Sequence, residues 1–155
     1  MRQRLRLTAE QFDKLEVNFQ KGGALMIHNR EITFIRCGEK TVWFDFNVLC
    51  NLPRSQLDYL ELTDRFSTFF VSNIRVLSEK SSVFVILFIQ LVDVLYDRGI
   101  RLVISAAVPL AELYVDGEMI SEFKRTLSRL EEMQSLDYRQ RHLPKPVCNL
   151  LPPFS

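Results

Sequence analysis

Two arginines four residues apart, Arg125 and Arg129, are the residues of this chain best suited to recognise a phosphate group. They lie in FKRTLSRLEEMQS, residues 123–135, where their spacing places both on one side of a predicted helix. An arginine side chain stays charged and can bind phosphate through two parallel hydrogen bonds. The alternative is a solvated helix face on which Arg129 pairs with Glu132, and the spacing alone favours this alternative.

Three further polar residues are candidates for a site. Asp45 ends the apolar run TVWFDF, which resembles the way a P-loop enzyme places a magnesium ligand. Without a phosphate loop, we expect Asp45 to cap or hydrogen-bond the loop after its strand. Arg54 and Asp58 are four residues apart, and we expect them to form an exposed ion pair that contributes a few tenths of a kcal/mol.

The chain contains neither of the two common phosphate-binding glycine motifs. A P-loop needs G-x-x-x-x-G-K-[ST], and a dinucleotide fold needs G-x-G-x-x-G, because backbone N–H groups must close around the phosphates. None of the five glycines begins such a motif: Gly22, Gly23, Gly38, Gly99 and Gly117. The sequence therefore predicts that these residues hold no phosphate cradle of either type.

Covalent and metal catalysis find little support in the residue pattern. Nothing in the sequence places a histidine near Cys50 to activate it as a nucleophile, so a buried structural role is expected for it. His28 and His142 share no metal-ligand spacing with each other or with a cysteine, and no metal site is expected. None of the serines lies in a G-x-S-x-G motif. Three widely spaced cysteines do not make a disulfide framework, which favours a reducing compartment.

Length and charge narrow the classes of protein further. The chain has 155 residues, which suits one domain, and its net charge of +1 gives no reason to expect a nucleic-acid or membrane partner. The most apolar stretch, residues 83–96, contains Gln90 and Asp93 and is shorter than the roughly 20 residues of a spanning helix. We expect it to be a largely buried helix.

The order of apolar patterns predicts an α/β fold with a small N-terminal β-hairpin. Strands alternate with helices from Val42 onward, as in parallel βαβ units, and right-handed crossovers are expected to place helices on both faces of the sheet. The expected helices are 8–20, 55–66, 82–96, 109–113 and 121–141, and the expected strands are 24–29, 31–36, 41–46, 68–77 and 101–106.

Local signals set the expected ends of these elements. Thr8 with Gln11 fits a capping box at the first helix, and Ser55 and Ser121 fit N-caps of later helices. The hairpin turn is expected around Asn29 and Arg30. Residues 1–141 are expected to form the domain, and residues 142–155, which contain four prolines, an extended tail.

Several long blocks resemble one known family. VWFDFNVLC, PRSQLDYLEL, LVDVLYDRGIRLVISAAVPLAELY and FKRTLSRLEEMQSLDY closely resemble the C-terminal half of the ZapE-type AAA+ ATPases, from about Thr8 to His142. In that family the P-loop, the Mg²⁺-binding acidic pair and the first sensor precede the matched region. The resemblance therefore implies a P-loop-NTPase-like fold that is incomplete without an upstream P-loop half, and a chain inactive by itself.

The resemblance also implies partners and conditions. ATP and Mg²⁺ serve the full-length family, and none is expected for this chain alone. The expected partner is an upstream P-loop domain or a neighbouring subunit, with a division-ring protein as a further candidate, in the cytoplasm. Arg129, then Arg125, become candidates for facing a phosphate or a subunit, because AAA+ ATPases use such arginines in trans.

One departure from the family pattern supports a different class of function. Ile86 and Leu87 stand in the apolar helix where relatives usually have two arginines. The change removes two charges and can add an apolar patch to an interface. The alternative hypothesis is therefore a protein-interaction module, derived from the ATPase, that works without nucleotide.

Overall fold

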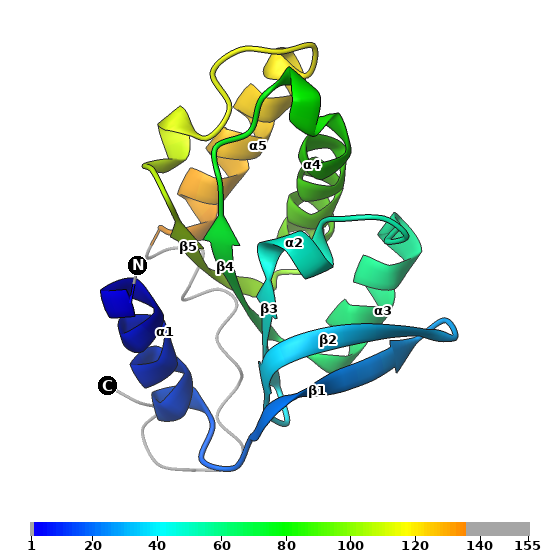
Figure 1. Cartoon of the computed structure of the whole chain (residues 1–155), viewed down its shortest axis with the longest axis vertical. Coiled ribbons are helices and arrows are strands. Elements are labelled where there is room, and N and C mark those ends of the chain that lie inside the picture. The colour runs from blue at the N-terminus through cyan, green and yellow to red at the C-terminus, as the bar shows by residue number, and fades with distance from the viewer. Residues whose placement is uncertain (1, 136–155) are drawn as a thin grey trace.

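The computed structural model describes residues 2–135, which form a five-stranded sheet with the strand order β1-β2-β3-β4-β5 (Figure 1). Strand β2 runs antiparallel to its neighbours β1 and β3, whereas β3, β4 and β5 are parallel. The strands are β1 (Gln20–Ile27), β2 (Arg30–Cys37), β3 (Thr41–Asp45), β4 (Thr68–Ile74) and β5 (Arg101–Ala106). The predicted α/β class and N-terminal hairpin are confirmed.

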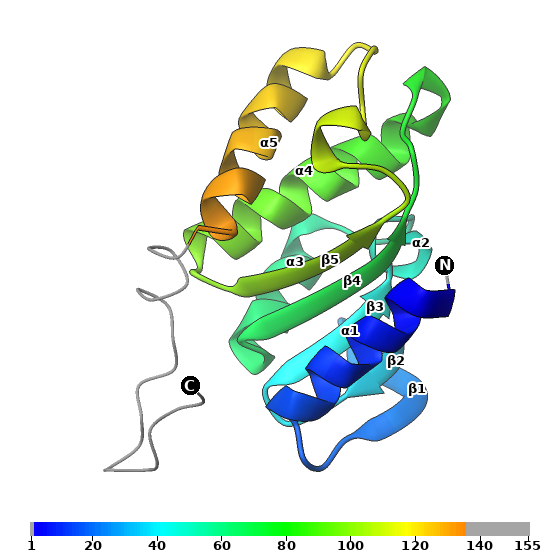
Figure 2. The same cartoon turned by 90° about the vertical axis from the view of Figure 1, so that its left-hand side faces the viewer.

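Four helices of the parallel units cover one face of the sheet, and one helix covers the other (Figure 2). The first group is α2 (Phe46–Leu49), α3 (Gln56–Arg65), α4 (Ser82–Asp97) and α5 (Ile120–Met133), and the helix on the other face is α1 (Arg2–Leu15). The prediction of crossovers on both faces was wrong. Because β3, β4 and β5 lie side by side in chain order, successive right-handed crossovers emerge on the same face.

The side chains of the parallel strands alternate between these two layers, as the pleat requires. Phe44 and Phe69 point into the large core beneath α3, α4 and α5, together with Leu102. Their neighbours Trp43 and Phe70 point to the opposite face and pack against α1. Both faces of the parallel strands are therefore covered, which explains why β3 and β4 are almost continuously apolar.

Helix α1 is held on its face by an aromatic cluster. Phe12 is fully buried, and its ring centroid lies 5.4 Å from that of Phe70 and 6.3 Å from that of Trp43. Arg36 from β2 forms an ion pair with Asp13 of α1. Its guanidinium also lies over the Trp43 ring, at 5.5 Å from the centroid. These contacts attach α1 to three strands, β2, β3 and β4.

The N-terminal helix begins earlier than its sequence signal suggested. Helix α1 starts at Arg2 and ends at Leu15, so Thr8 lies within the helix and is not its N-cap. Thr8 is instead buried at 7% exposure. The residues before Thr8 are mostly Arg, Gln and Leu, which have high helix propensity and extend the helix toward the N-terminus.

The β1–β2 hairpin turns at His28 and Asn29, one residue earlier than predicted. Both residues have positive φ angles, 50° and 64°. Positive φ at both central positions is the conformation of a two-residue type I′ turn, which matches the twist of the flanking strands. Gly22 and Gly23 lie inside β1 with φ angles of 70° and 145°, a backbone conformation that glycine adopts without steric cost.

The remaining boundaries follow the sequence signals at α3 and α4 and depart from them at α5. Ser55 is the N-cap of α3, as predicted, in a capping box with Asp58. Helix α5 begins at Ile120 after the N-cap Met119, so Ser121 is not the cap. It ends at Met133, short of the predicted end, and the predicted tail 142–155 lies outside the described residues. Within residues 2–135, no helix is long and apolar enough to cross a bilayer.

Candidate functional site

The two predicted arginines occupy different environments on α5. Arg129 forms an ion pair with Asp93 of α4, and its guanidinium carbon lies 5.1 Å from the centroid of the Tyr96 ring. Both charged side chains are partly buried, at 27% and 29% exposure. The ion pair that Arg129 makes with Asp93 therefore links α5 to α4.

Arg125 lies one helical turn before Arg129 and is exposed. Within residues 2–135, the Arg125 side chain makes no hydrogen bond, ion pair or ring contact. A guanidinium in this position keeps all five of its N–H donors for water or for another molecule. Of the two arginines, Arg125 is the one whose donors are available for a phosphate or a carboxylate.

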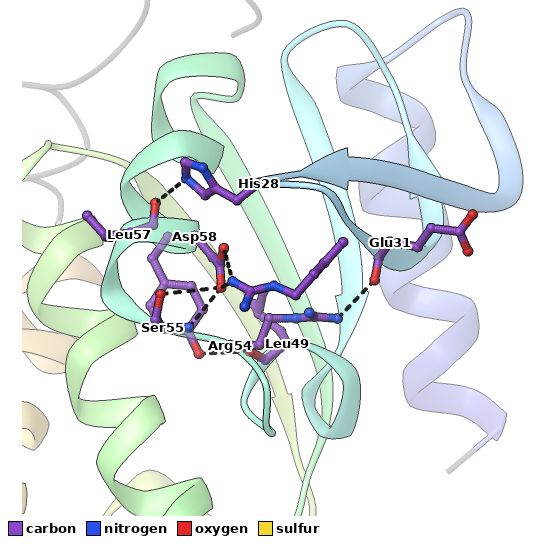
Figure 3. Close-up of polar contacts among 9 residues, drawn as sticks. His28, Glu31, Leu49, Arg54, Ser55, Leu57 and Asp58 are labelled. Carbon is purple, nitrogen blue, oxygen red and sulfur yellow. Dashed lines mark hydrogen bonds and ion pairs between the residues drawn. The ribbon is translucent and has the colours of Figure 1, made fainter.

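The second site lies between the tip of the hairpin and the start of α3 (Figure 3). Asp58 is fully buried, and both of its carboxylate oxygens accept hydrogen bonds of 2.8 Å from Nη2 of Arg30. The backbone N–H of Ser55 donates a third hydrogen bond, of 2.9 Å, to the same carboxylate. Asp58 thus serves at once as the N3 residue of the capping box and as the partner of an arginine on β2. We call this contact the Asp58–Arg30 clip.

Arg54 lies beside this clip without forming the predicted hydrogen-bonded pair with Asp58. Its Nη2 donates to the backbone oxygen of Glu31 at 3.4 Å instead. Burial lowers the pKa of Arg54, and the nearby charge of Asp58 acts in the opposite direction. The prediction was wrong because Arg30, 28 residues away in sequence, takes the carboxylate.

A weak polar contact supports the same junction. Nε2 of His28, in the hairpin turn, lies 3.4 Å from the backbone oxygen of Leu57 in α3 (Figure 3). Together with the Asp58–Arg30 clip, this contact fixes the hairpin tip against the first turn of α3. The arrangement is that of a structural clamp, since both oxygens of the buried Asp58 carboxylate accept hydrogen bonds. Within the described residues, the Nε atoms of Arg30 and Arg54 are buried there without a hydrogen-bond partner.

Cys50 and Tyr59 form a polar contact inside the core behind this clamp. Both side chains are inaccessible, and Tyr59 donates a hydrogen bond of 2.7 Å to the backbone oxygen of Leu49. Burial raises the pKa of the Cys50 thiol and of the Tyr59 hydroxyl far above their ordinary values. A thiol that stays protonated is a poor nucleophile, which agrees with the structural role expected for Cys50.

Asp45 lies at the C-terminal end of β3 and caps the helix that follows. Its Oδ1 accepts a hydrogen bond of 2.8 Å from the backbone N–H of Asn47, at the start of α2. Its Oδ2 accepts one of 2.6 Å from the side chain of Asn73, at the end of β4. The carboxylate therefore joins the ends of two parallel strands. Among the described residues, no cluster of three potential metal ligands is present.

Two of the partners were not found from the sequence because they are distant along the chain. Arg30 gave no local signal, since nothing in its surroundings indicates a partner on α3. Asp93 did give a signal: it is an acidic residue in a helix whose other residues are nearly all apolar. Such a charge indicates a partner on a neighbouring element, but spacing alone cannot identify it.

Comparison with known proteins gives one family and several relatives. The family model of AFG1-like ATPases matches residues 6–142. The chain is 37% identical over 139 residues to the cell division protein ZapE of Escherichia coli, across 86% of this chain and 37% of that protein. It is 29% identical over 119 residues to lactation elevated protein 1 homolog B of Danio rerio, across 77% of this chain and 24% of that protein.

The chain thus spans about a third of the length of the ZapE proteins that it matches. An uncharacterized protein of Schizosaccharomyces pombe is 38% identical over 88 residues, across 57% of this chain and 19% of that protein. No solved structure matches the chain.

Proposed function

Because the chain belongs to the AFG1-like ATPase family, we propose that it forms the C-terminal part of an ATP-hydrolysing AAA+ protein and works with a P-loop half. The P-loop half, in the same chain or another, binds ATP and Mg²⁺. The part described here supplies arginines and a docking surface and does not hydrolyse ATP by itself.

The main support for this proposal is that the junction between β3 and α2 already holds a carboxylate where a phosphate would bind backbone N–H groups. A phosphate cradle needs free backbone N–H groups at the start of a helix. At the junction between β3 and α2, the carboxylate of Asp45 already accepts the N–H of Asn47. Its negative charge also repels a phosphate. The next junction, residues 75–81, contains no glycine, so neither connection resembles a P-loop.

The contacts on α5 favour Arg125 as the arginine that faces a phosphate or a neighbouring subunit. Arg129 is engaged by Asp93 and by the ring of Tyr96, so it acts as a positioning residue that holds α5 against α4. Arg125 is exposed on the same side of the helix. A guanidinium supplied in trans to a γ-phosphate accelerates hydrolysis by roughly 10³–10⁵-fold in other P-loop enzymes.

The test is an ATPase assay on the chain mixed with the P-loop half of a relative. We expect hydrolysis only in the mixture and expect Arg125→Ala to reduce it by about 10³-fold. Lys124→Ala is the matched control, because Lys124 is the exposed neighbour of Arg125, and we expect it to leave the rate unchanged. Mg²⁺-dependent ATP binding by the chain alone, measured by calorimetry, would contradict the proposal.

A nucleotide-independent interaction module is the second candidate function. Ile86 is 40% exposed and Val83, one turn earlier on α4, is 37% exposed. Leu87 is buried, so only one residue of the Ile86–Leu87 pair adds to the apolar surface. Under this alternative, the P-loop half adds no ATPase activity, and the mixing experiment distinguishes the two functions.

The relatives also suggest a setting. ZapE carries the name of a cell division protein, and on that basis we propose a division-ring protein as a partner of this chain. The cytoplasm is the compartment that this partner implies. Co-purification of a division-ring component with the chain, lost on Arg125→Ala or Ile86→Arg, is the observation that this part of the proposal expects.

A further inference from the structure

The junction between the hairpin tip and the start of α3 holds two arginines but only one buried carboxylate. Arg30 and Asp58 balance one another in the Asp58–Arg30 clip, where Nη2 of Arg30 lies 2.8 Å from both carboxylate oxygens. Within residues 2–135, the side chain of Arg54 makes one hydrogen bond, to the backbone oxygen of Glu31 at 3.4 Å, and no ion pair. One positive charge at this junction therefore has no carboxylate of its own.

The other acidic residues near Arg54 do not supply the missing carboxylate. Glu31 offers Arg54 its backbone oxygen, while its carboxylate points away from the guanidinium (Figure 3). Glu61, one turn after Asp58 on α3, pairs with Arg65 at 3.0 Å. Burial and, to a smaller extent, repulsion by Arg30 lower the pKa of Arg54. An anion bound beside Arg54 would offset that repulsion.

Both arginines also keep hydrogen-bond donors without a partner in the described part of the chain. The Nε atoms of Arg30 and Arg54 are buried and make no hydrogen bond. Their Nη1 atoms are not buried and make none either. Because a guanidinium carries five N–H donors in a planar fork, an oxygen ligand placed at the two Nη1 atoms meets donors from both side chains.

Two exposed leucines lie beside Arg54 in the sequence and add an apolar part to this surface. Leu52 is 68% exposed in the loop after α2, and Leu57 is 66% exposed in the first turn of α3. The backbone oxygen of Leu57 lies 3.4 Å from Nε2 of His28, which places Leu57 next to the hairpin tip (Figure 3). We call Arg54, Leu52 and Leu57 the Arg54 surface.

The composition of the Arg54 surface determines which ligand fits it. A phosphate or a nucleic-acid backbone would use the guanidinium and leave both leucines in water. A peptide with a carboxylate next to apolar side chains would pair with the charge and cover the leucines at the same time. Complementary charge also disfavours basic segments, because they would approach a surface that already has surplus positive charge.

We propose that the Arg54 surface binds an acidic peptide segment of a partner protein, in which Asp or Glu stands beside leucine or another apolar residue. The carboxylate of the partner accepts hydrogen bonds from Arg54, with Nη1 of Arg30 as a second donor. The apolar side chains of the partner pack on Leu52 and Leu57. The Asp58–Arg30 clip holds the hairpin tip in place while the partner binds.

This inference goes beyond the proposed function, because it requires neither nucleotide nor a P-loop half. It is measured on the chain alone, at a junction formed by the hairpin and α3 and not by α5, which carries Arg125. Failure of the mixture to hydrolyse ATP would leave the binding measurement unchanged, so the two proposals fail separately.

An amide NMR titration of the full chain with a synthetic peptide tests the proposal. The probe is Ser-Leu-Asp-Glu-Leu-Ser, and its control is Ser-Leu-Asn-Gln-Leu-Ser, which has the same shape without the charges. We expect the acidic peptide to shift the amides of Leu52, Leu57 and His28. We expect the uncharged peptide to bind about tenfold more weakly, which corresponds to ~1.4 kcal/mol.

Variants of the chain then assign the binding to particular side chains. We expect Arg54→Gln to weaken binding of the acidic peptide by about tenfold and Arg54→Lys to weaken it less, because lysine keeps the charge but not the planar fork. Arg65→Gln is the matched control, since it removes the same charge from the other end of α3, and we expect a change below about twofold.

The leucines have a control of their own. We expect Leu57→Ser to weaken binding by about threefold, whereas Val115→Ser, at a residue 70% exposed in the loop before α5, should leave it unchanged. Thermal melting of each variant checks that it is folded. Because Leu57 and Arg54 make few contacts in the fold, we expect the melting temperatures to stay close to that of the unaltered chain.

Three results would overturn the proposal. Equal affinity for the two peptides means that the carboxylates play no part. The absence of saturable shifts at Leu52, Leu57 and His28 with millimolar acidic peptide means that the Arg54 surface does not bind such segments. Tighter binding of inorganic phosphate than of the acidic peptide, lost in Arg54→Gln and unaffected by Leu57→Ser, means that the ligand is a phosphate group.

Discussion

Replacing Asp58 by alanine is expected to destabilise the fold by about 3 kcal/mol. Breaking a buried ion pair from one side costs about 3–5 kcal/mol, because the remaining charge is left without a partner. The Arg30 side chain is 38% exposed, so its guanidinium can regain water, and the cost falls at the low end of that range. The N–H of Ser55 loses its partner as well.

Urea denaturation followed by the fluorescence of Trp43, the single tryptophan, measures this change. Asp64→Ala is the matched control on the same helix. Asp64 pairs with Arg98 at 3.0 Å, but its side chain is 62% exposed, so the expected loss is below about 1 kcal/mol. Equal losses for the two variants would refute the reasoning, because they would mean that burial adds nothing to the Asp58–Arg30 clip.

A double replacement separates the pair from the packing around it. Arg30→Met combined with Asp58→Leu removes both charges and keeps apolar volume at the junction. Replacing both members of a buried pair by apolar residues is often neutral. We expect the double variant to recover most of the stability that Asp58→Ala loses.

Three further predictions concern other parts of the molecule. The free energy of unfolding should fall above about pH 8.5, because the Cys50 thiol then ionises in the unfolded chain, whereas burial raises its pKa in the folded chain. The expected slope is up to about 1.4 kcal/mol per pH unit. Urea denaturation at several pH values measures it, and the slope should be shallower in Cys50→Ala. Phe12→Ala should cost about 3–5 kcal/mol and shift the emission of Trp43 to the red, since it removes the ring that covers this residue on the α1 face. Asn29→Gly should raise the melting temperature slightly, by the equivalent of about 0.5 kcal/mol, because glycine adopts the positive φ of this turn position without strain.

The sequence predicted the parts of the fold that depend on near neighbours. Helix α3 begins where Ser55 and Asp58 form a capping box, which is a signal contained in four residues. The long apolar helix α4 and the strand after it, β5, were placed well because their apolar patterns are uninterrupted. Thr8 shows the limit of this approach: a capping signal can occur inside a helix when strong helix formers precede it.

The candidate site depends on contacts that no local pattern contains. Asp58 has an arginine at the favourable spacing, Arg54, yet its hydrogen bonds come from Arg30 on another element. Arg129 likewise pairs with Asp93, 36 residues away, and not across one turn with Glu132. Local spacing describes which pairs are geometrically allowed, whereas the packing of helices and strands decides which pairs form.

The way the hairpin is attached has a mechanical consequence. Its base joins the rest of the sheet through only two residue pairs between β2 and β3, Arg36 with Trp43 and Cys37 with Val42. Its far end is held by the Asp58–Arg30 clip, by the contact of His28 with Leu57, and by Ile27 and Ile32, which are fully buried in the main core. A hairpin attached at both its base and its tip moves little, whereas one attached only at its base can move about that base. We therefore expect loss of the clip to lower the free energy at which the hairpin tip opens locally, below that of global unfolding.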